Sequence, residues 1–170
     1  AIVQGVTKFY GLCNRIDELD KDKTDLSCVW WVIKELGLRP PHDLFEKLTG
    51  DDIIEIYEPS GLQIFRSFNM FRYISYTLDQ LFTFVWWQLF ERDAKVTEAM
   101  FEIAKKLLTG QLKDYADVDL PAHAVKEVFG PEKRVAMMKN RFGCTLFGKD
   151  NQPACFMSVF RIVGDGQISH

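Results

Sequence analysis

The feature that most constrains the fold of this chain is a change in the spacing of its apolar residues at Gly50. Before Gly50, apolar residues recur at steps typical of one face of an α-helix. After it, the short stretches 53–57 and 62–68 have the character of strands and are joined by a Pro-Ser-Gly turn at 59–61. The chain therefore combines a helical N-terminal part with a part that begins in a β-hairpin.

The helical part is expected to contain three helices. The charged stretch 17–25 ends the first, and Asp25 can cap the second. Gly37 is a natural C-terminal cap for the second helix, and the prolines at 40–41 suit the start of a third helix that runs through Leu48. The first helix carries an apolar stripe formed by Val3, Val6, Phe9, Tyr10, Cys13 and Ile16. This stripe should pack on the rest of the chain or on a second copy of it.

Helical spacing returns after the hairpin. Thr77 is a good N-cap for a helix that continues through Leu89, and a further helix is expected over 94–108. A loop is expected over 111–122. Three strands should follow, over 124–129, 134–147 and 154–163, joined by turns at 130–133 and 148–151. Helices and antiparallel strands in this order predict an α+β fold.

Composition narrows the class of protein. The chain has 170 residues, of which 47% are apolar and 26% charged, and this suits one globular domain with a full core. Its formal net charge of −3 argues against nucleic acid as the main partner. The longest apolar runs, 29–33 and 81–87, are far shorter than the roughly 20 residues of a membrane span, and no signal peptide is visible.

The cysteines are expected to be reduced thiols. None forms a CxxC pair or a zinc-type spacing with histidine, and each lies in an apolar run where cysteine acts as a small hydrophobic residue. They are Cys13, Cys28, Cys144 and Cys155. Reduced thiols are typical of intracellular proteins, so we expect a cytoplasmic location.

Several short motifs, in this order, resemble those of the PAS family of sensory and regulatory domains. The stretch 52–64, DIIEIYEPSGLQI, is similar to the family's opening hairpin, and Asn69 falls where the family often has asparagine. The stretch 76–81, YTLDQL, is similar to the family's GYSxEEL segment, and 86–90, WWQLF, occupies its aromatic-rich approach to the long helix. The stretch 149–163, KDNQPACFMSVFRIV, looks like the final hairpin and strand.

The resemblance covers about residues 51–163 and implies a fold. It is a PAS-like five-stranded antiparallel sheet with helices on one face, preceded by a helical N-terminal segment. The expected parts are a helical extension over 1–50 for dimerisation or capping, a PAS-like sensor domain over 51–163 and a polar tail over 164–170. Two positions depart from the family pattern, because Ser75 and Asn151 stand where glycine is usual. Asparagine tolerates the left-handed conformation of a tight turn, so the second departure is mild.

The same resemblance implies a function and a set of partners. A non-catalytic sensory or regulatory module of a cytoplasmic, bacterial signalling protein is expected, acting through ligand or partner binding, dimerisation and an output domain outside this chain. A small apolar or aromatic ligand would fill the concave side of the sheet, with Phe68, Met70, Trp86, Phe101 and Met138 as its binding residues. A homodimer would form through Val6, Phe9, Tyr10 and Cys13.

A sensor of gas, redox state or light that binds haem or flavin is the alternative. Flavin light sensors of this family need a reactive cysteine after the short helices, and the equivalent stretch 83–92 contains none. Haem sensors usually take a histidine from the long helix, and 94–110 contains none. His123 lies just outside that helix and could ligate haem only if it points inward. No cofactor is therefore predicted.

Catalytic and metal sites are not indicated either. No Ser-His-Asp arrangement or phosphate-binding loop is visible, so no catalytic residue is predicted. A metal site is one interpretation of the carboxylates Asp51, Asp52, Glu55 and Glu58. We instead interpret them as a capping pair followed by the solvent-facing alternates of an edge strand. The inside of the sheet is accordingly expected to be filled by aromatic rings and not by titrating groups.

Overall fold

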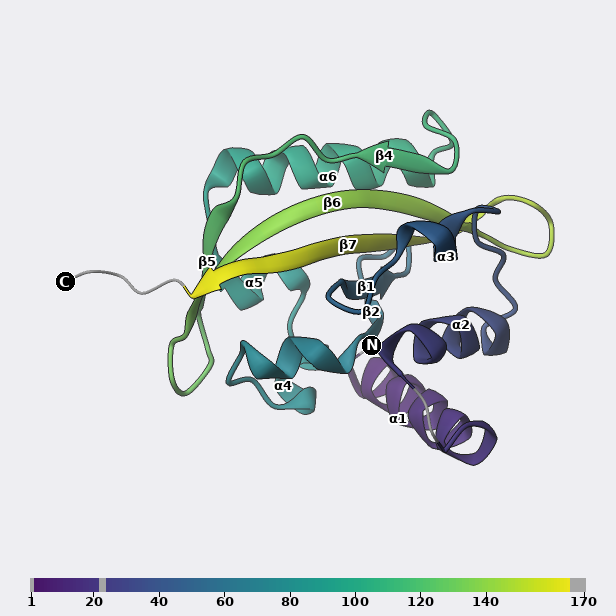
Figure 1. Ribbon diagram of the computed structural model, residues 1–170, viewed down its shortest axis with the longest axis horizontal. Helices are drawn as coiled ribbons and strands as arrows, with labels where there is room; N and C mark the ends of the chain where they lie inside the picture. The colour runs from purple at the N-terminus through teal and green to yellow at the C-terminus, as the bar shows by residue number, and fades with distance from the viewer. Residues whose placement is uncertain (1, 22–23, 166–170) are drawn as a thin grey trace.

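The computed structural model describes residues 2–21 and 24–165 (Figure 1). Its helices are α1 (Ile2–Leu19), α2 (Asp25–Glu35), α3 (Leu44–Lys47), the 3-10 helix η1 (Phe68–Arg72), α4 (Leu78–Thr83), α5 (Trp86–Leu89) and α6 (Ala94–Leu108). Its strands are β1 (Ile53–Tyr57), β2 (Gln63–Arg66), β3 (Phe90–Glu91), β4 (Tyr115–Asp117), β5 (His123–Glu127), β6 (Val135–Phe147) and β7 (Pro153–Asp165).

The strands form one antiparallel sheet in the order β2-β1-β7-β6-β5-β3, with β4 also paired to β6. The predicted α+β class is confirmed, and all five expected strands are present. Two short strands were not predicted. β3 is only two residues long, and β4 lies inside the expected loop 111–122. The last strand extends to Asp165, so the expected polar tail begins as strand, and residues 166–170 lie outside the described residues.

Local signals placed most helix ends correctly. Thr77 caps α4 through a reciprocal pair of hydrogen bonds with Gln80, as its position predicted. Three details were wrong. The third helix does not start at the prolines 40–41, because α3 begins only at Leu44. Thr24 caps α2, and the neighbouring Asp25 instead accepts a hydrogen bond from the backbone N–H of Phe68 at 2.9 Å. The single helix expected after Thr77 is two helices, because extended backbone at 84–85 separates α4 from α5.

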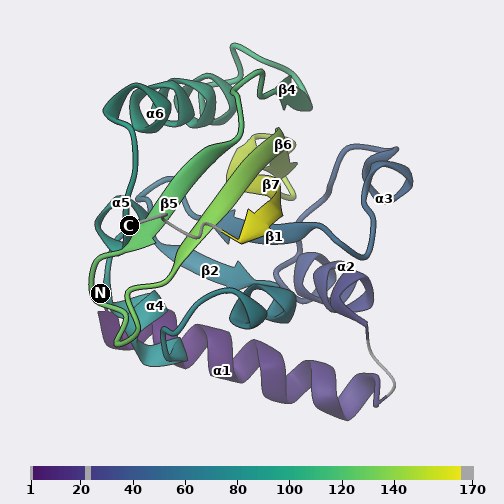
Figure 2. The ribbon, with the colours of Figure 1, turned by 60° about the vertical axis from the view of Figure 1, so that its left-hand side comes forward.

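The sheet has two faces, and they carry different residues. The inner face is defined by Ile53, Glu55 and Tyr57 of β1, and the outer face by the alternating Ile54 and Ile56. Helix α6 covers the inner face and α1 lies on the opposite side of the sheet, as Figure 2 shows. On the outer face, the rings of Phe9 in α1 and Phe65 in β2 lie 6.3 Å apart, and both side chains are buried.

The interpretation of β1 as an edge strand was wrong. β1 lies between β2 and β7, and all five of its residues are buried. Glu55 therefore does not face solvent, and it is paired across the strands with Arg66. An exposed edge was inferred because charged residues alternate with apolar ones, but here the second face of the strand is covered by helices as well.

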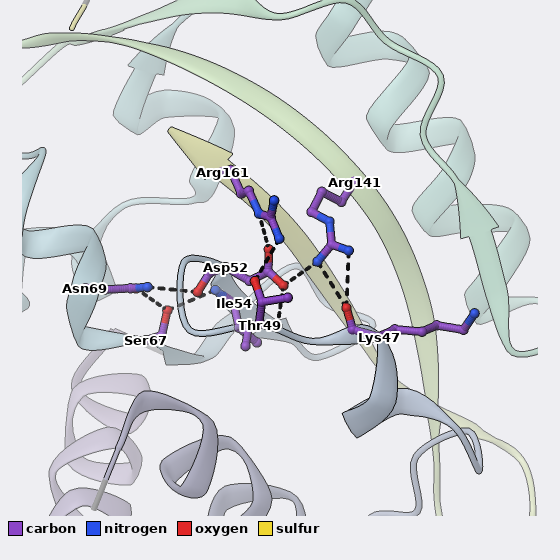
Figure 3. A network of polar contacts seen from close by, with 8 residues as sticks. All are labelled: Lys47, Thr49, Asp52, Ile54, Ser67, Asn69, Arg141 and Arg161. Carbon is purple, nitrogen blue, oxygen red and sulfur yellow. Dashed lines mark hydrogen bonds and ion pairs between the residues drawn. The ribbon is translucent and has the colours of Figure 1, made fainter. Parts of the chain in front are cut away.

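A polar network anchors the start of β1 on the outer side (Figure 3). The fully buried carboxylate of Asp52 is ion-paired with Arg161 at 2.8 Å and with Arg141. It also accepts a hydrogen bond from the Thr49 N–H at 2.8 Å, while Asn69 donates to the Asp52 carbonyl at 2.8 Å. Because a buried charge is stable only with such partners, the network fixes β1 against β6 and β7.

Helix α6 is held against the inner face at its C-terminal end. A Cβ atom at Gly143 of β6 would lie 2.7 Å from the Phe156 ring and 3.1 Å from Leu107, so only glycine permits this close approach. Leu107 is fully buried, and its carbonyl accepts a hydrogen bond from Thr145 Oγ1 at 3.3 Å. The rest of α6 then lies across the inner face beside α5.

Candidate functional site

A cavity of about 470 Å³ lies between the inner face of the sheet and helices α5 and α6. Its volume falls within the range of sites that hold small molecules. Strand residues form the floor: Glu55, Tyr57, Arg66, Met138, Phe156 and Ser158. Helical residues form the wall: Trp86, Trp87, Met100, Phe101, Ala104 and Leu108.

The wall is a cluster of aromatic rings. The ring of Phe101 lies 4.8 Å from that of Trp86 and 5.2 Å from that of Trp87. Trp87 and Phe101 remain about 40% exposed, at 39% and 42%, so the rings border an opening to solvent. Gly61, at a φ of +82°, brings the β1–β2 turn against Trp87, where a Cβ atom would lie 3.3 Å from the indole ring. The cavity is thus open at one end and lined there by flat surfaces.

The floor is polar and buried. The Arg66 side chain is 1% exposed and is ion-paired with Glu55 Oε1 through Nη2. The Tyr57 hydroxyl donates a hydrogen bond to Glu55 Oε2. Burial, and then the charge of Glu55, raise the pKa of Tyr57 well above its ordinary value, so this phenol remains a neutral donor. With its amide oxygen turned towards Arg66, Gln63 accepts from Nε and Nη2 at 3.1 Å each.

Arg92 brings a second guanidinium to the cavity from the segment between β3 and α6. Its guanidinium lies 5.2 Å from the centre of the Trp86 ring and 5.8 Å from that of Phe90, close enough for cation–π attraction. Burial lowers the pKa of Arg92 from its ordinary value. Among the described residues, no carboxylate forms an ion pair with Arg92.

Two buried guanidinium nitrogens at this site have no hydrogen-bond partner. They are Arg66 Nη1 and Arg92 Nε. A buried N–H group without an acceptor costs free energy, so most proteins satisfy such groups. The floor can therefore accept further hydrogen-bond acceptors, in addition to those that the chain supplies.

Three of the predicted binding residues line the cavity: Trp86, Phe101 and Met138. The other two, Phe68 and Met70, lie in η1 and not in the lining. Met70 is fully buried in the core, and the half-exposed Phe68 ring lies 6.2 Å from that of Phe9.

The expectation of an interior filled by rings alone was wrong, because Glu55, Tyr57, Arg66 and Arg92 lie there too. The sequence signal for two of them was present. Glu55 and Arg66 are the charged residues within two otherwise apolar-rich strands, but alternation alone does not reveal which face is covered.

The residues expected to form a dimer interface differ in burial, although they lie along one side of α1. Phe9 is 1% exposed and packs within the chain, its ring 4.4 Å from that of Phe82. Tyr10 is 43% exposed, and Val6 and Cys13 are partly buried. The side chain of Val3, which was expected in the same stripe, lies outside the described residues.

The residues around the cavity do not fit the cofactor chemistry considered from the sequence. None of the four cysteines is among the lining residues. His123, on β5 opposite Met138, also lies outside the lining, and its Nδ1 is 3.1 Å from the Pro121 carbonyl oxygen. Burial is the main cause that lowers the pKa of His123, whose Nε2 is buried without a partner. The cavity thus offers neither the thiol nor the histidine that those flavin and haem sites use.

The described residues contain neither a candidate metal site nor a candidate membrane-spanning helix. No group of three or more His, Cys, Asp and Glu side chains is placed to hold a metal ion. No helix within 2–21 and 24–165 has the length and apolar character needed to cross a membrane.

Comparisons with known proteins identify the fold. No family model matches the sequence, and no curated protein matches it. Among solved structures, the PAS-B domain of Drosophila melanogaster Cycle with bound ethylene glycol is similar, with a TM-score of 0.50 and 8% identity over 65% of this chain and 98% of that one. A light-oxygen-voltage domain studied with a flavin analogue has a TM-score of 0.52 and 14% identity over 72% of this chain and 86% of that one. The PAS-like fold expected from the sequence is thus confirmed.

Proposed function

We propose that this chain is a non-catalytic sensory module that binds a small molecule in the cavity and passes its presence to a signalling partner. The observation that carries the proposal is the cavity itself, which combines an aromatic wall with a floor of buried charged groups. The PAS-like fold supports it, because this fold can hold a ligand on the concave side of its sheet. The module is proposed to act in the cytoplasm of a bacterium, as part of a protein with a separate output domain.

A ligand bound in the cavity would pass its signal through α5 and α6, the helices that form the cavity wall. Trp86 lies in α5 and Phe101 in α6, and both side chains would contact a bound molecule. A ligand that binds one position of these helices more tightly than another shifts the population towards it. The buried Leu107 at the end of α6 would serve as the fixed point about which this shift occurs.

The test uses a neutral aromatic probe, N-phenyl-1-naphthylamine, whose fluorescence rises in an apolar site. We expect saturable binding to the whole chain and loss of binding in the Ala104→Phe variant, which fills the cavity from α6. Glu102→Phe, on the exposed side of the same helix, is the matched control and should bind as the wild type does. Equal binding by all three proteins would overturn the proposal.

A visible absorption spectrum of the purified chain separates the proposal from its alternative. A Soret or flavin band would support a cofactor-binding sensor of gas, redox state or light.

Assembly as a homodimer is part of the same proposal. Tyr10 is the most exposed of the four residues expected at the interface, so a second copy would contact α1 there. Sedimentation equilibrium tests it: we expect a dimer mass for the chain and a monomer mass for Tyr10→Glu. A monomer mass for the unchanged chain would remove dimerisation from the proposal and leave ligand binding intact.

A further inference from the structure

We propose that the ligand of this cavity is an aromatic acid, whose carboxylate is bound by Arg66 and Arg92 while its ring lies against Trp86 and Phe101. This inference rests on the proposed function of the cavity as a ligand site. It specifies the chemical class of the ligand from the charges and open hydrogen-bonding groups of the lining.

Positively charged side chains outnumber negatively charged ones in the lining of the cavity. On the floor, the single carboxylate of Glu55 faces the guanidinium groups of Arg66 and Arg92. At the rim, Glu58 is engaged with Lys8, whereas no carboxylate of the described residues is ion-paired with Lys105. Burying an uncompensated cation is costly, so the empty arrangement is less stable than one completed by an anion.

The carboxylate of Glu55 cannot supply the missing partner. One of its oxygens is ion-paired with Arg66 Nη2, and the other accepts from the Tyr57 hydroxyl. Arg66 Nη1 and Arg92 Nε nevertheless remain without acceptors. A guanidinium binds a carboxylate in its own plane through two N–H groups, so an acid is the ligand group that suits both arginines.

The surfaces beside these two arginines indicate the shape of the rest of the ligand. Arg92 is stacked on Trp86, which itself lies 4.8 Å from the Phe101 ring. A molecule whose acidic group meets Arg92 therefore has an aromatic wall directly next to that group. A flat ring close to the carboxylate fits this arrangement, because aromatic pairs favour offset or edge-to-face contact.

Amines and uncharged amides fit the lining less well. An amine would add a positive charge beside Arg66 and Arg92, which like-charge repulsion disfavours. An amide of the same shape offers a neutral oxygen in place of a carboxylate, so it can accept hydrogen bonds from the arginines but does not neutralise their buried positive charge. The order of affinity should therefore be acid, then amide, then amine.

The experiment compares three probes that differ only in this group: 2-naphthylacetic acid, 2-naphthylacetamide and 2-(2-naphthyl)ethylamine. Calorimetry on the whole chain at pH 7.5 should show the acid binding about tenfold more tightly than the amide, as expected for a hydrogen-bonded charge. Arg92→Gln should lower the binding affinity of the acid by about the same factor and leave the affinity of the amide unchanged. Arg72→Gln, at an exposed position of η1, is the matched control and should change neither affinity.

The outcomes separate this inference from the proposed function. If the amide or the amine binds as tightly as the acid, or if Arg92→Gln weakens acid and amide equally, the acid assignment is wrong while the cavity remains a ligand site. If none of the three probes binds and N-phenyl-1-naphthylamine does not bind either, both are wrong. Circular dichroism of Arg92→Gln confirms that any loss of binding is measured on folded protein.

Discussion

The two faces of β1 differ in what they bury, although both are covered. On the outer face, Ile54 and Ile56 are fully buried beneath the N-terminal helices, in the main hydrophobic core. On the inner face, Glu55 and Tyr57 are also buried but border a cavity and are hydrogen-bonded to one another. Adjacent residue pairs show the contrast: Ile56 is opposite Phe65, and Glu55 is opposite Arg66.

This difference between the two faces indicates that, within the pair β1 and β2, the outer face serves stability and the inner face serves function. Apolar side chains on the outer face stabilise the fold through the area that they remove from water. A buried ion pair contributes little net stability, because its desolvation offsets much of the attraction. The outer face thus holds the fold together, and the inner face retains groups that the fold does not need.

The largest expected effect is on the outer face. Phe65→Ala should lower the free energy of unfolding by about 3–5 kcal/mol, because it empties a fully buried site against α1. Urea denaturation measures the change. Phe68→Ala removes the same side chain from a position that is 39% exposed, and it should cost less than about 1.5 kcal/mol. Equal losses in the two variants would mean that burial against α1 does not stabilise the sheet.

A smaller effect on the free energy of unfolding is expected when the inner-face ion pair of Glu55 and Arg66 is replaced. In the double variant Glu55→Met with Arg66→Met, the free energy of unfolding should stay within about 1 kcal/mol of the wild type, because two buried charges are exchanged for apolar side chains. The Tyr57 hydroxyl keeps a partner, since Gln63 lies 3.1 Å from it. Binding of 2-naphthylacetic acid should be lost in the same variant. A loss of stability as large as that of Phe65→Ala would contradict the distinction between the faces.

The smallest effect concerns the pH dependence of an inner-face histidine. Burial lowers the pKa of His123 below its ordinary value of 6.5, and the nearby charge of Arg92 acts in the same direction. The unfolded chain therefore binds the proton more readily, and this contribution to stability is lost as pH falls through about 6.5. His123→Gln should flatten the decline in urea midpoint between pH 7 and pH 5.

His42 provides the control for that measurement, because it is exposed at the surface before α3. The His42→Gln variant should follow the pH dependence of the wild type. If both histidine variants decline in parallel with the wild type, His123 is not a group whose burial opposes protonation.

Much of the fold could be predicted because its signals are local. The capping pair Thr77 and Gln80, the left-handed Gly37 and the tight turn at Asn151, with a φ of 68°, depend on residues close in sequence. The two short strands were missed for the opposite reason. β3 and β4 are two and three residues long and are defined by their pairing with β5 and β6, which no local pattern reveals.

The site could be predicted only in part. Trp86 lies at the start of α5 and Phe101 in the middle of α6, and their proximity follows from an order of elements that the sequence indicates. Arg66 lies in β2 and Arg92 in the segment between β3 and α6, and only the packed sheet brings them to one floor. Phe68 was misplaced because a strand was expected to continue through it, whereas η1 turns it away from the cavity.

The sequence by itself determined the order of the main helices and strands and several of their ends, since caps, turns and apolar spacing act over a few residues. Only the tertiary structure decided which face of β1 would border a cavity and which would join the core. The physical reason is that alternation assigns side chains to two faces but does not say what covers either one. That choice comes from helices distant in the chain, α1 on one side and α6 on the other.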